Sequence, residues 1–513
     1  MNNQPGLTLL QKGLLTVGCV AAALLMTSVI QLSADQPQVS RMAGVAVLMA
    51  VCWITEAIPL AVTALFPVVL LPLLGIQDGK AVAGEYFNYI IFLYVGGFLV
   101  ALAMQRWNLH KRIALKTLLF VGVHPRRLLL GFMLATAFLS MWISNTATAM
   151  MMVTIAMAVI VPLRERLSDR CADSVTTGLL LGVAYAASIG GIATLVGTPP
   201  NLSFARILEI QFPDAPSISF ASWMQLALPI SLAMFSVTWA LLSLRYMNVE
   251  EGTLLEEEVL QQQYDDLGPA SFAERVVLVD FAILVVLWLF RNDLVLGAIT
   301  IPGWSQLLAE PGFINDGAVA VAAAIPLFLI PSRSGDGSRI LDWETANGLP
   351  WHIVLLFGGG FALASGFVES GLSDWLGGQL GGAAALPPYA MLLLICLGIT
   401  FLTELTSNIA TTEMILPVLA SLAVAIDMHP LLLMVPATIS CSCAFMMPVA
   451  TPPNAIVFGA GSLKIREMVR TGVILNLIGV VVIVAGMWLL GGMALGVTAN
   501  GLPDWAGSIG ETR

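Results

Sequence analysis

The sequence predicts an all-α protein that crosses a membrane many times, and three observations support this fold class. Of the 513 residues, 58% are hydrophobic and only 11% are charged, whereas soluble domains carry about 25% charged residues. The mean hydropathy is +0.90. Apolar tracts of about 17 to 25 residues, which match the hydrocarbon core of a bilayer, recur from end to end. These observations exclude a soluble globular fold.

Counting the tracts in order predicts about eleven membrane-crossing helices and two re-entrant hairpins. The first tract, Gly13 to Ile30, lacks a convincing small-residue cleavage site, so we interpret it as a retained helix and not as a signal peptide. The predicted helices are residues 13–31, 42–56, 58–75, 88–105, 177–205, 226–246, 275–291, 316–331, 351–367, 431–460 and 471–493, with breaks near 198 and 451.

Three motifs occur twice, in the same order and at nearly the same separation along the chain. They are "YVGGF" and "FGGGF", then "FLSMWISNTATAM" and "FLTELTSNIATTEM", and finally "VGTPPN" and "VATPPN". Chance could explain one recurrence, but hardly three. The chain therefore contains a two-fold internal repeat.

The distribution of charge predicts that the two repeats are inverted. Six basic residues follow the first glycine motif: Arg106, Lys111, Arg112, Lys116, Arg126 and Arg127. Acidic Glu369 and Asp374 follow the second, and no Lys or Arg occurs from Leu341 to Leu463. Because cytoplasmic loops collect Lys and Arg, we expect the first connection inside and the second outside. Inverted repeats of this kind are typical of secondary transporters.

Each repeat contains one predicted hairpin. Residues 128–163 carry no charge, and as a single helix they would be about 54 Å long, too long for a bilayer. Basic residues flank both ends, so the segment should enter and leave on the cytoplasmic side, with Ser144 to Thr146 at its tip. The second copy, residues 386–426, has no basic residue at either end and should enter from outside.

These elements predict a division of the chain. Residues 1–87 form N-terminal scaffold helices, and 88–246 form the first inverted repeat, with the hairpin 128–163 and the break near 198. An acidic cytoplasmic loop, a helix and a connection occupy 247–315. The second repeat and the last helix occupy 316–493, with the hairpin 386–426 and the break near 451, and 494–513 form a C-terminal tail. The N-terminus is predicted inside and the C-terminus outside.

The polar tips and Pro-Pro breaks predict a binding site for a small anion and cations. A helix break leaves carbonyl oxygens free on one side, and the next half-helix begins with a partial positive charge of about +0.5. Ser, Asn and Thr suit helix starts, and Pro suits the first turn. Such residues also join helices in membranes without any ligand. The duplication of both motifs in inverted repeats favours the binding site.

The motifs "SNTAT", "TSNIATT", "GTPPN" and "ATPPN", together with "WITEAIPLAVTAL" and "WNLHKRIAL", resemble the divalent anion/sodium symporter family. The resemblance runs from about Gly44 to Trp488. Members of this family carry dicarboxylates, tricarboxylates or sulfate. The resemblance implies a homodimer in the cell (inner) membrane, an elevator-type movement of a transport domain against a scaffold domain, and at least two sodium sites.

The resemblance also implies the site residues. The first sodium would bind Asn145 and backbone oxygens of Ser140, Ser144 and Gly197. The second would bind Asn408 and backbone oxygens of Thr403, Thr406 and Ala450. The substrate would meet Asn145, Thr146, Thr198, Asn408, Ile409, Thr451 and Pro452. Ile409 departs from the family's usual Ser-Asn-Thr tip, so the second carboxylate contact is in question.

Three acids lie in or near apolar tracts, namely Glu56, Glu404 and Glu413. Intramembrane acids are candidates for ion coupling, although a structural role is the commoner alternative for each. The sequence offers no nucleophile–base pair and no metal-ligand set, so we expect no enzyme and no catalytic residue. Nucleic acid is not an expected partner.

The leading hypothesis is sodium-coupled symport of succinate, malate or fumarate. A sodium-independent dicarboxylate exchanger and a sulfate symporter are alternatives, and an anion channel is a further one. An exchanger would place a positive side chain at a cation site, but neither tip nor TPPN motif contains Lys or Arg.

Overall fold

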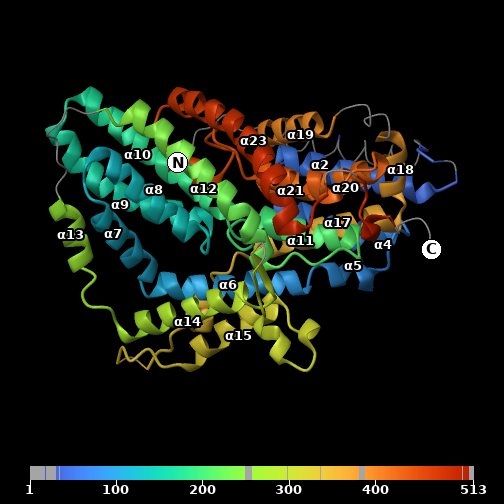
Figure 1. Cartoon of the computed structure of the whole chain (residues 1–513), viewed down its shortest axis with the longest axis horizontal. Helices are drawn as coiled ribbons and strands as arrows, with labels where there is room; N and C mark the ends of the chain where they lie inside the picture. The colour runs from blue at the N-terminus through green and yellow to red at the C-terminus, as the bar shows by residue number, and fades with distance from the viewer. Residues whose placement is uncertain are drawn as a thin grey trace.

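The computed structural model describes Gly18 and residues 31–33, 35–248, 257–296, 299–335, 337–380, 387–498 and 501–507. The predicted first helix, 13–31, lies almost wholly outside these residues. Within them the chain is mainly helical (Figure 1), which confirms the predicted fold class. A short antiparallel ribbon of β1 (Leu294–Leu296) and β2 (Ile299–Ile301) is an addition that the sequence did not predict.

The helices of the first half run from α2 to α14. They are α2 (Pro37–Thr55), α3 (Leu60–Thr63), α4 (Phe66–Leu73), α5 (Gly79–Glu85), α6 (Tyr89–Arg106), α7 (Leu109–Val121), α8 (Pro125–Ser140), α9 (Asn145–Arg166), α10 (Asp169–Ile192), α11 (Pro199–Gln211), α12 (Phe220–Tyr246), α13 (Glu257–Asp265) and α14 (Phe272–Leu289).

The second half continues from α15 to α23. Its helices are α15 (Asp316–Leu329), α16 (Trp343–Ala346), α17 (Trp351–Glu369), α18 (Leu372–Leu380), α19 (Pro388–Leu402), α20 (Asn408–Ala425), α21 (Pro430–Cys441), α22 (Pro452–Gly459) and α23 (Ile465–Leu495). In the described residues, eight helical segments are long and apolar enough to cross a membrane. The predicted number of crossings, eleven, stays a prediction.

Both predicted hairpins are helix pairs in the structure. The first consists of α8 and α9, joined by residues 141–144, and the second of α19 and α20, joined by 403–407. In each repeat the next helix is broken: α10 ends before residues 193–198 and α11 follows, and α21 ends before residues 442–451 and α22 follows. The two hairpins lie toward opposite ends of the long axis (Figure 1).

Two predicted spans need correction. Residues 58–75 form the short helices α3 and α4 and not one continuous helix, because Pro67 lacks the backbone N–H that a continuous helix would need and lies in the first turn of α4. The second broken helix is interrupted over the whole segment 442–451, and not only near 451.

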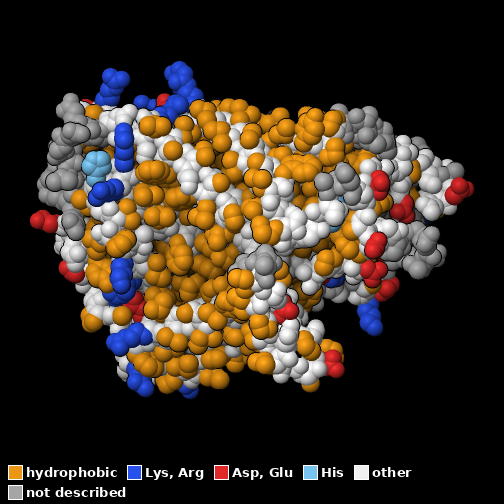
Figure 2. Space-filling model, in the orientation of Figure 1, with side chains coloured by type: hydrophobic (Ala, Val, Ile, Leu, Met, Phe, Trp, Pro, Cys, Tyr) orange, Lys and Arg blue, Asp and Glu red, His pale blue; other side chains and the backbone are white. Residues whose placement is uncertain are grey.

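Charged side chains separate along the long axis of the molecule. On the face shown in Figure 2, most Lys and Arg side chains gather at the end near α7, α9 and α10, and Asp and Glu gather near α5 and α18. An apolar belt covers the surface between the two ends. This arrangement suits a protein whose two ends face different aqueous compartments.

The repeated glycine motifs permit close helix packing. A Cβ at Gly96 of α6 would lie 2.6 Å from the backbone of Ala320 in α15, and one at Gly359 of α17 would overlap the backbone of Ala64. These contacts bring α6 and α17 against other helices around the centre of the molecule, as small residues do in membrane proteins.

Candidate functional site

Four helix N-termini meet at one central cavity. The N-cap residues of α9, α11, α20 and α22 are Ser144, Thr198, Ser407 and Thr451, in that order. All four line the same cavity, which has a volume of about 640 Å³. Pro199 and Pro452 occupy the first turns of α11 and α22, where a missing N–H removes no intrahelical hydrogen bond. The cavity therefore faces four helix N-termini, and of these α9 and α20 keep backbone N–H groups at their first two positions, whereas α11 and α22 begin with two prolines.

Asn145 lies at the centre of the first polar cluster. The hydroxyl of Ser140 lies 2.5 Å from its amide and donates to the carbonyl oxygen of Ala187 at 2.7 Å. When the amide nitrogen faces inward, it donates to the carbonyl oxygens of Ala187 and Gly197, each at 3.2 Å. The hairpin tip and the helix break thus contribute oxygen atoms around one asparagine.

The second cluster repeats this pattern around Asn408. The hydroxyl of Thr403 lies 2.8 Å from Asn408 Oδ1 and 2.9 Å from the carbonyl oxygen of Cys441, to which it donates. Thr403 corresponds to Ser140 in the aligned motifs, and Cys441 belongs to the helix that corresponds to α10. The internal repeat in the sequence is therefore also a repeat of the polar geometry.

Two asparagines that the sequence reasoning did not assign hold the helix breaks together. Asn201 Nδ2 donates to the carbonyl oxygens of Gly191, Ile192 and Thr194, the last at 2.7 Å. Asn454 Nδ2 donates to those of Ala444 and Met447, each at 3.0 Å. Each Asn thereby satisfies carbonyl groups that the broken helix leaves unpaired. The duplicated TPPN motif was the signal for this role.

Glu404 supports the second break. Its two carboxylate oxygens accept hydrogen bonds from the backbone N–H groups of Phe445, Met446 and Met447, at 2.7 to 2.9 Å, and from Asn476 Nδ2 at 2.7 Å. The side chain is 2% exposed. With four donors around it, this buried carboxylate is well satisfied as an anion.

The structure brings together nearly all residues that the sequence singled out. All seven predicted substrate residues line the cavity: Asn145, Thr146, Thr198, Asn408, Ile409, Thr451 and Pro452. Of the predicted sodium ligands, Ser144, Asn145, Gly197, Thr406, Asn408 and Ala450 also line it, and Ser140 and Thr403 lie behind the two asparagines.

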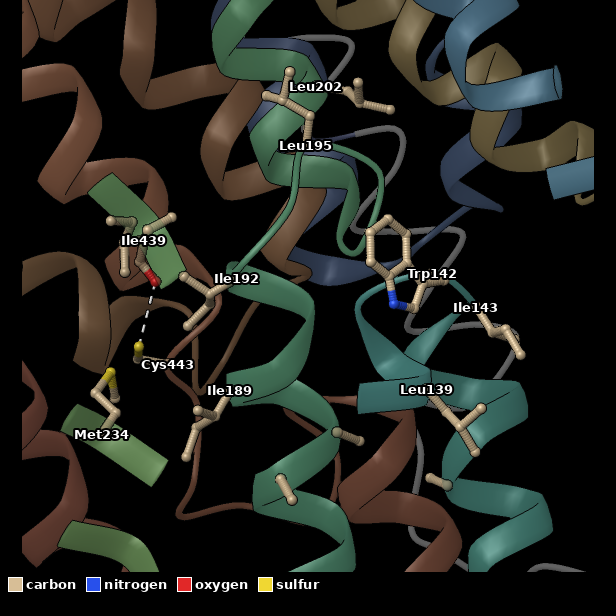
Figure 3. Close-up of a cluster of buried hydrophobic side chains, with 14 of the residues drawn as sticks. Leu139, Trp142, Ile143, Ile189, Ile192, Leu195, Leu202, Met234, Ile439 and Cys443 are labelled. Atoms are coloured by element: carbon tan, nitrogen blue, oxygen red, sulfur yellow. Dashed lines mark hydrogen bonds between the residues drawn. The ribbon is translucent and has the colours of Figure 1, made fainter. Parts of the chain in front are cut away.

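Residues outside the hairpin tips and the helix breaks form the rest of the cavity wall. Residues of the α2–α3 turn, including Glu56, line it with Tyr94 and Phe98 of α6 and Ile353 of α17. Glu56 has a left-handed backbone (φ 47°) at the end of α2. Figure 3 shows that the tip residue Trp142 lies beside the break that follows Ile192, and Trp142 also lines the cavity.

The fold and this cavity define a polytopic membrane protein with a central cavity between paired helix breaks. The model of the sodium:sulfate symporter transmembrane region matches residues 11–496, and the chain belongs to this family.

Similar proteins cover most of the chain. Solute carrier family 13 member 2 of Rattus norvegicus is 43% identical, with 85% of this chain and 86% of that protein aligned. The sodium-dependent dicarboxylate transporter SdcS of Staphylococcus saprophyticus is 42% identical, over 87% and 85%. The Na(+)/dicarboxylate cotransporter 3 of Mus musculus is 39% identical, over 92% and 90%.

Two solved structures share the fold at low identity. The YdaH transporter of Alcanivorax borkumensis aligns with a TM-score of 0.55 at 14% identity, over 82% of this chain and 90% of that one. MtrF of Neisseria gonorrhoeae aligns with a TM-score of 0.56 at 11% identity, over 91% and 97%. These likenesses support the arrangement of helices.

Proposed function

We propose that the protein is a secondary active transporter that carries a dicarboxylate such as succinate, malate or fumarate into the cell together with sodium. The observation that carries this proposal is the convergence of four helix N-termini and two asparagine clusters on one cavity. Relatives that align over most of the chain are named as sodium-dependent dicarboxylate transporters.

Each half of the cavity suits one carboxylate. The start of α9 would receive one carboxylate group through Asn145, the hydroxyl of Thr146 and free N–H groups, because helix N-termini favour anions. The start of α20 would receive the other through Asn408. Thr198, Thr451 and Pro452 would complete the walls between them.

Sodium would bind behind the carboxylates, at the two asparagine clusters. Hard cations prefer oxygen ligands, and each cluster offers an Asn side chain, a neighbouring hydroxyl and backbone carbonyls. At the first cluster, the Asn145 amide would turn so that its oxygen and that of Gly197 share the ion, in place of the hydrogen bond from Nδ2. A bound sodium would also place positive charge beside the anion.

The family suggests how the cycle proceeds. We propose a homodimer in the inner membrane, in which the hairpins and broken helices move as an elevator against a scaffold. The charge separation along the long axis supports a cytoplasmic N-terminus, a C-terminus outside and hairpins that enter from opposite sides.

A direct test is uptake of radiolabelled succinate, citrate and sulfate into proteoliposomes, with and without a sodium gradient. We expect sodium-dependent succinate uptake with a Hill coefficient above one for sodium. Equal uptake when choline replaces sodium would favour the sodium-independent exchanger, and preferred uptake of sulfate would favour the sulfate symporter. Uptake that does not saturate with succinate would favour a channel.

The orientation has its own test. Arg127 before α8 and Asp374 of α18 are both exposed. Cysteine at Arg127 should react with an impermeant thiol reagent only from the cytoplasm, and cysteine at Asp374 only from outside. Labelling of both from the same side would show that the two hairpins do not enter from opposite sides.

A further inference from the structure

Glu413 is a second buried acid of the second repeat, and its surroundings differ from those of Glu404. It lies on α20 beyond the cavity and is 0% exposed. The hydroxyl of Ser203 on α11 donates to Oε1. Oε2 has no hydrogen-bond partner within the described residues. A Cβ at Gly360 of α17 would overlap the carboxyl, so only glycine leaves room for it.

No positive charge is placed beside this carboxyl in the described part of the chain. The helices packed against α20 are α2, α11, α17, α18 and α21. The titratable and charged groups on them are Arg41, Cys52 and the capping Glu56 of α2, Arg206 and Glu209 of α11, His352 and Glu369 of α17, Asp374 of α18, and Cys441 and the capping His429 of α21. Arg206 forms ion pairs with Glu85 and Glu209, and Arg41 donates to the carbonyl oxygen of Leu74.

A comparison with Glu404 indicates which protonation state of Glu413 the packing favours. Glu404 receives four hydrogen bonds, whereas Glu413 receives one. Removing a carboxylate from water costs several kcal/mol even after the protein relaxes, and one hydroxyl donor offsets about 1.5–3 kcal/mol. The anion is therefore far better satisfied at Glu404 than at Glu413, and the packing around Glu413 favours the neutral acid.

The fold does not require an acid at this position. In the aligned motifs, Glu413 corresponds to Met150 of α9, and Ser203 corresponds to Ile456 of α22. Helices α9 and α22 pack together as α20 and α11 do. At these positions the first repeat has two apolar side chains, of which Met150 is 57% exposed, whereas the second repeat has a buried carboxyl and a buried hydroxyl.

We propose that Glu413 is a proton-binding site, protonated while α20 packs on the glycine face of α17 and deprotonated when that contact opens in the transport cycle. This proposal rests on the proposed function, because it requires that the helices separate during transport. On opening, the O–H bond of the carboxyl breaks, the electron pair stays on the carboxylate and the proton passes to water. On closing, Glu413 must take up a proton again.

The direction of the pH effect follows from this step. The closed packing favours the protonated form, so it is fully available at low pH and becomes harder to re-form as the pH rises. Each pH unit adds about 1.36 kcal/mol to the free energy of closing. Where closing limits turnover, succinate uptake should fall by up to about ten-fold per pH unit.

The experiment measures sodium-driven succinate uptake in proteoliposomes over a neutral to alkaline range in which succinate stays a dianion. The wild type should lose uptake as the pH rises, and Glu413→Gln should show a nearly flat profile. Glu413→Met, which copies the counterpart in the first repeat, serves if the Gln variant does not fold. Glu344→Gln, at an exposed acid of α16, is the matched control and should keep the wild-type slope.

Infrared spectroscopy provides a second measurement. The wild type should show a band of a buried protonated carboxyl group that is missing in Glu413→Gln and changes when sodium and succinate are added. A flat wild-type pH profile, an unchanged slope in Glu413→Gln, or the absence of this band would overturn the proton site. Loss of sodium dependence at every pH would instead contradict the proposed function, so the two failures are distinguishable.

Discussion

The two halves of the site agree in their binding geometry and differ in what supports it. In both, a hydroxyl of the hairpin links an asparagine to a carbonyl of the broken helix, through Ser140 in one and Thr403 in the other. In both, an asparagine of the TPPN motif satisfies carbonyls at the break. The contacts that hold the two helix breaks, and the helices packed around them, differ between the two halves. We infer that the ligand-facing geometry is constrained in both halves and that the supporting contacts can differ.

The two helix breaks show this difference. The first, residues 193–198, is held by Thr194, whose hydroxyl donates to the carbonyl oxygen of Met141 at 2.6 Å and accepts from the N–H of Gly197 at 3.0 Å. The second, 442–451, is longer, and three successive N–H groups turn toward Glu404. Glu404 occupies the position of Met141 in the aligned motifs. A longer break frees more backbone donors, and a carboxylate satisfies them together.

The surrounding helices also differ. α17 packs along both α20 and α11, whereas its counterpart α6 packs mainly against α15. As a result, Met150 of the first junction is 57% exposed, and Glu413 of the second is 0% exposed. In this structure α17 covers the second helix junction, and the side chain of Met150 at the first junction stays exposed.

The largest effect is expected from replacing the asparagine at the hairpin tip of either half. Asn145→Ala and Asn408→Ala should each abolish sodium-driven succinate uptake, because each side chain would serve a cation and a carboxylate together. The exposed Asn347→Ala of the α16 end is the control. Full uptake in either variant would show that the two halves do not contribute equivalent sites.

The second-largest effect is expected at Glu404, which supports the helix break of the second half and corresponds to Met141 in the first half. Glu404→Ala would leave three backbone donors and Asn476 without their acceptor, and each unsatisfied buried group costs about 1–3 kcal/mol. We expect a loss of more than about 3 kcal/mol in the free energy of unfolding, seen as a large fall of Tm in detergent. Met141→Ala, at the counterpart position, should lower Tm much less.

A Glu404→Gln variant sharpens this test. Gln keeps one acceptor oxygen and loses the charge, so its Tm should lie between those of the wild type and Glu404→Ala. A Tm for Glu404→Ala as high as that of Met141→Ala would contradict the supporting role of the carboxylate.

The glycines of the two halves should respond differently to a single methyl group. A Cβ at Gly360 would overlap the Glu413 carboxyl, whereas one at Gly97 would meet Trp288 at 3.4 Å, an ordinary contact. Gly360→Ala should therefore destabilise the protein by about 1–3 kcal/mol, and Gly97→Ala should have a small effect on Tm. Equal shifts in Tm would mean that α17 moves aside to accept the methyl group.

Local patterns in the sequence predicted the hairpin tips and the breaks, and the resemblance to a known family implied the residues that line the cavity. Short motifs such as Ser-Asn-Thr and Thr-Pro-Pro-Asn define these features by themselves, and their duplication shows that they belong together. The bond from Glu404 to Phe445 and the contact of Glu413 with Ser203 were not predictable. Both join residues that lie far apart in the chain, and no local pattern fixes which helices meet. The α3–α4 break, in contrast, follows a local signal, Pro67.

The smallest expected effect concerns position 409, where the tips themselves differ. Thr146 is exposed to the cavity, whereas Ile409 lines it but is half-buried against an apolar cluster that includes Ala64 and Tyr86. Ile409→Thr would supply a hydroxyl near the second carboxylate, and a hydrogen bond to a charged group contributes about 1.5 kcal/mol at the lower end of its range. The KM for succinate should fall by about ten-fold or less, and the sodium dependence should stay nearly unchanged. The reverse change, Thr146→Ile, should raise the KM. If Ile409→Thr altered sodium activation and left the KM alone, position 409 would belong to the cation site and not to the substrate site.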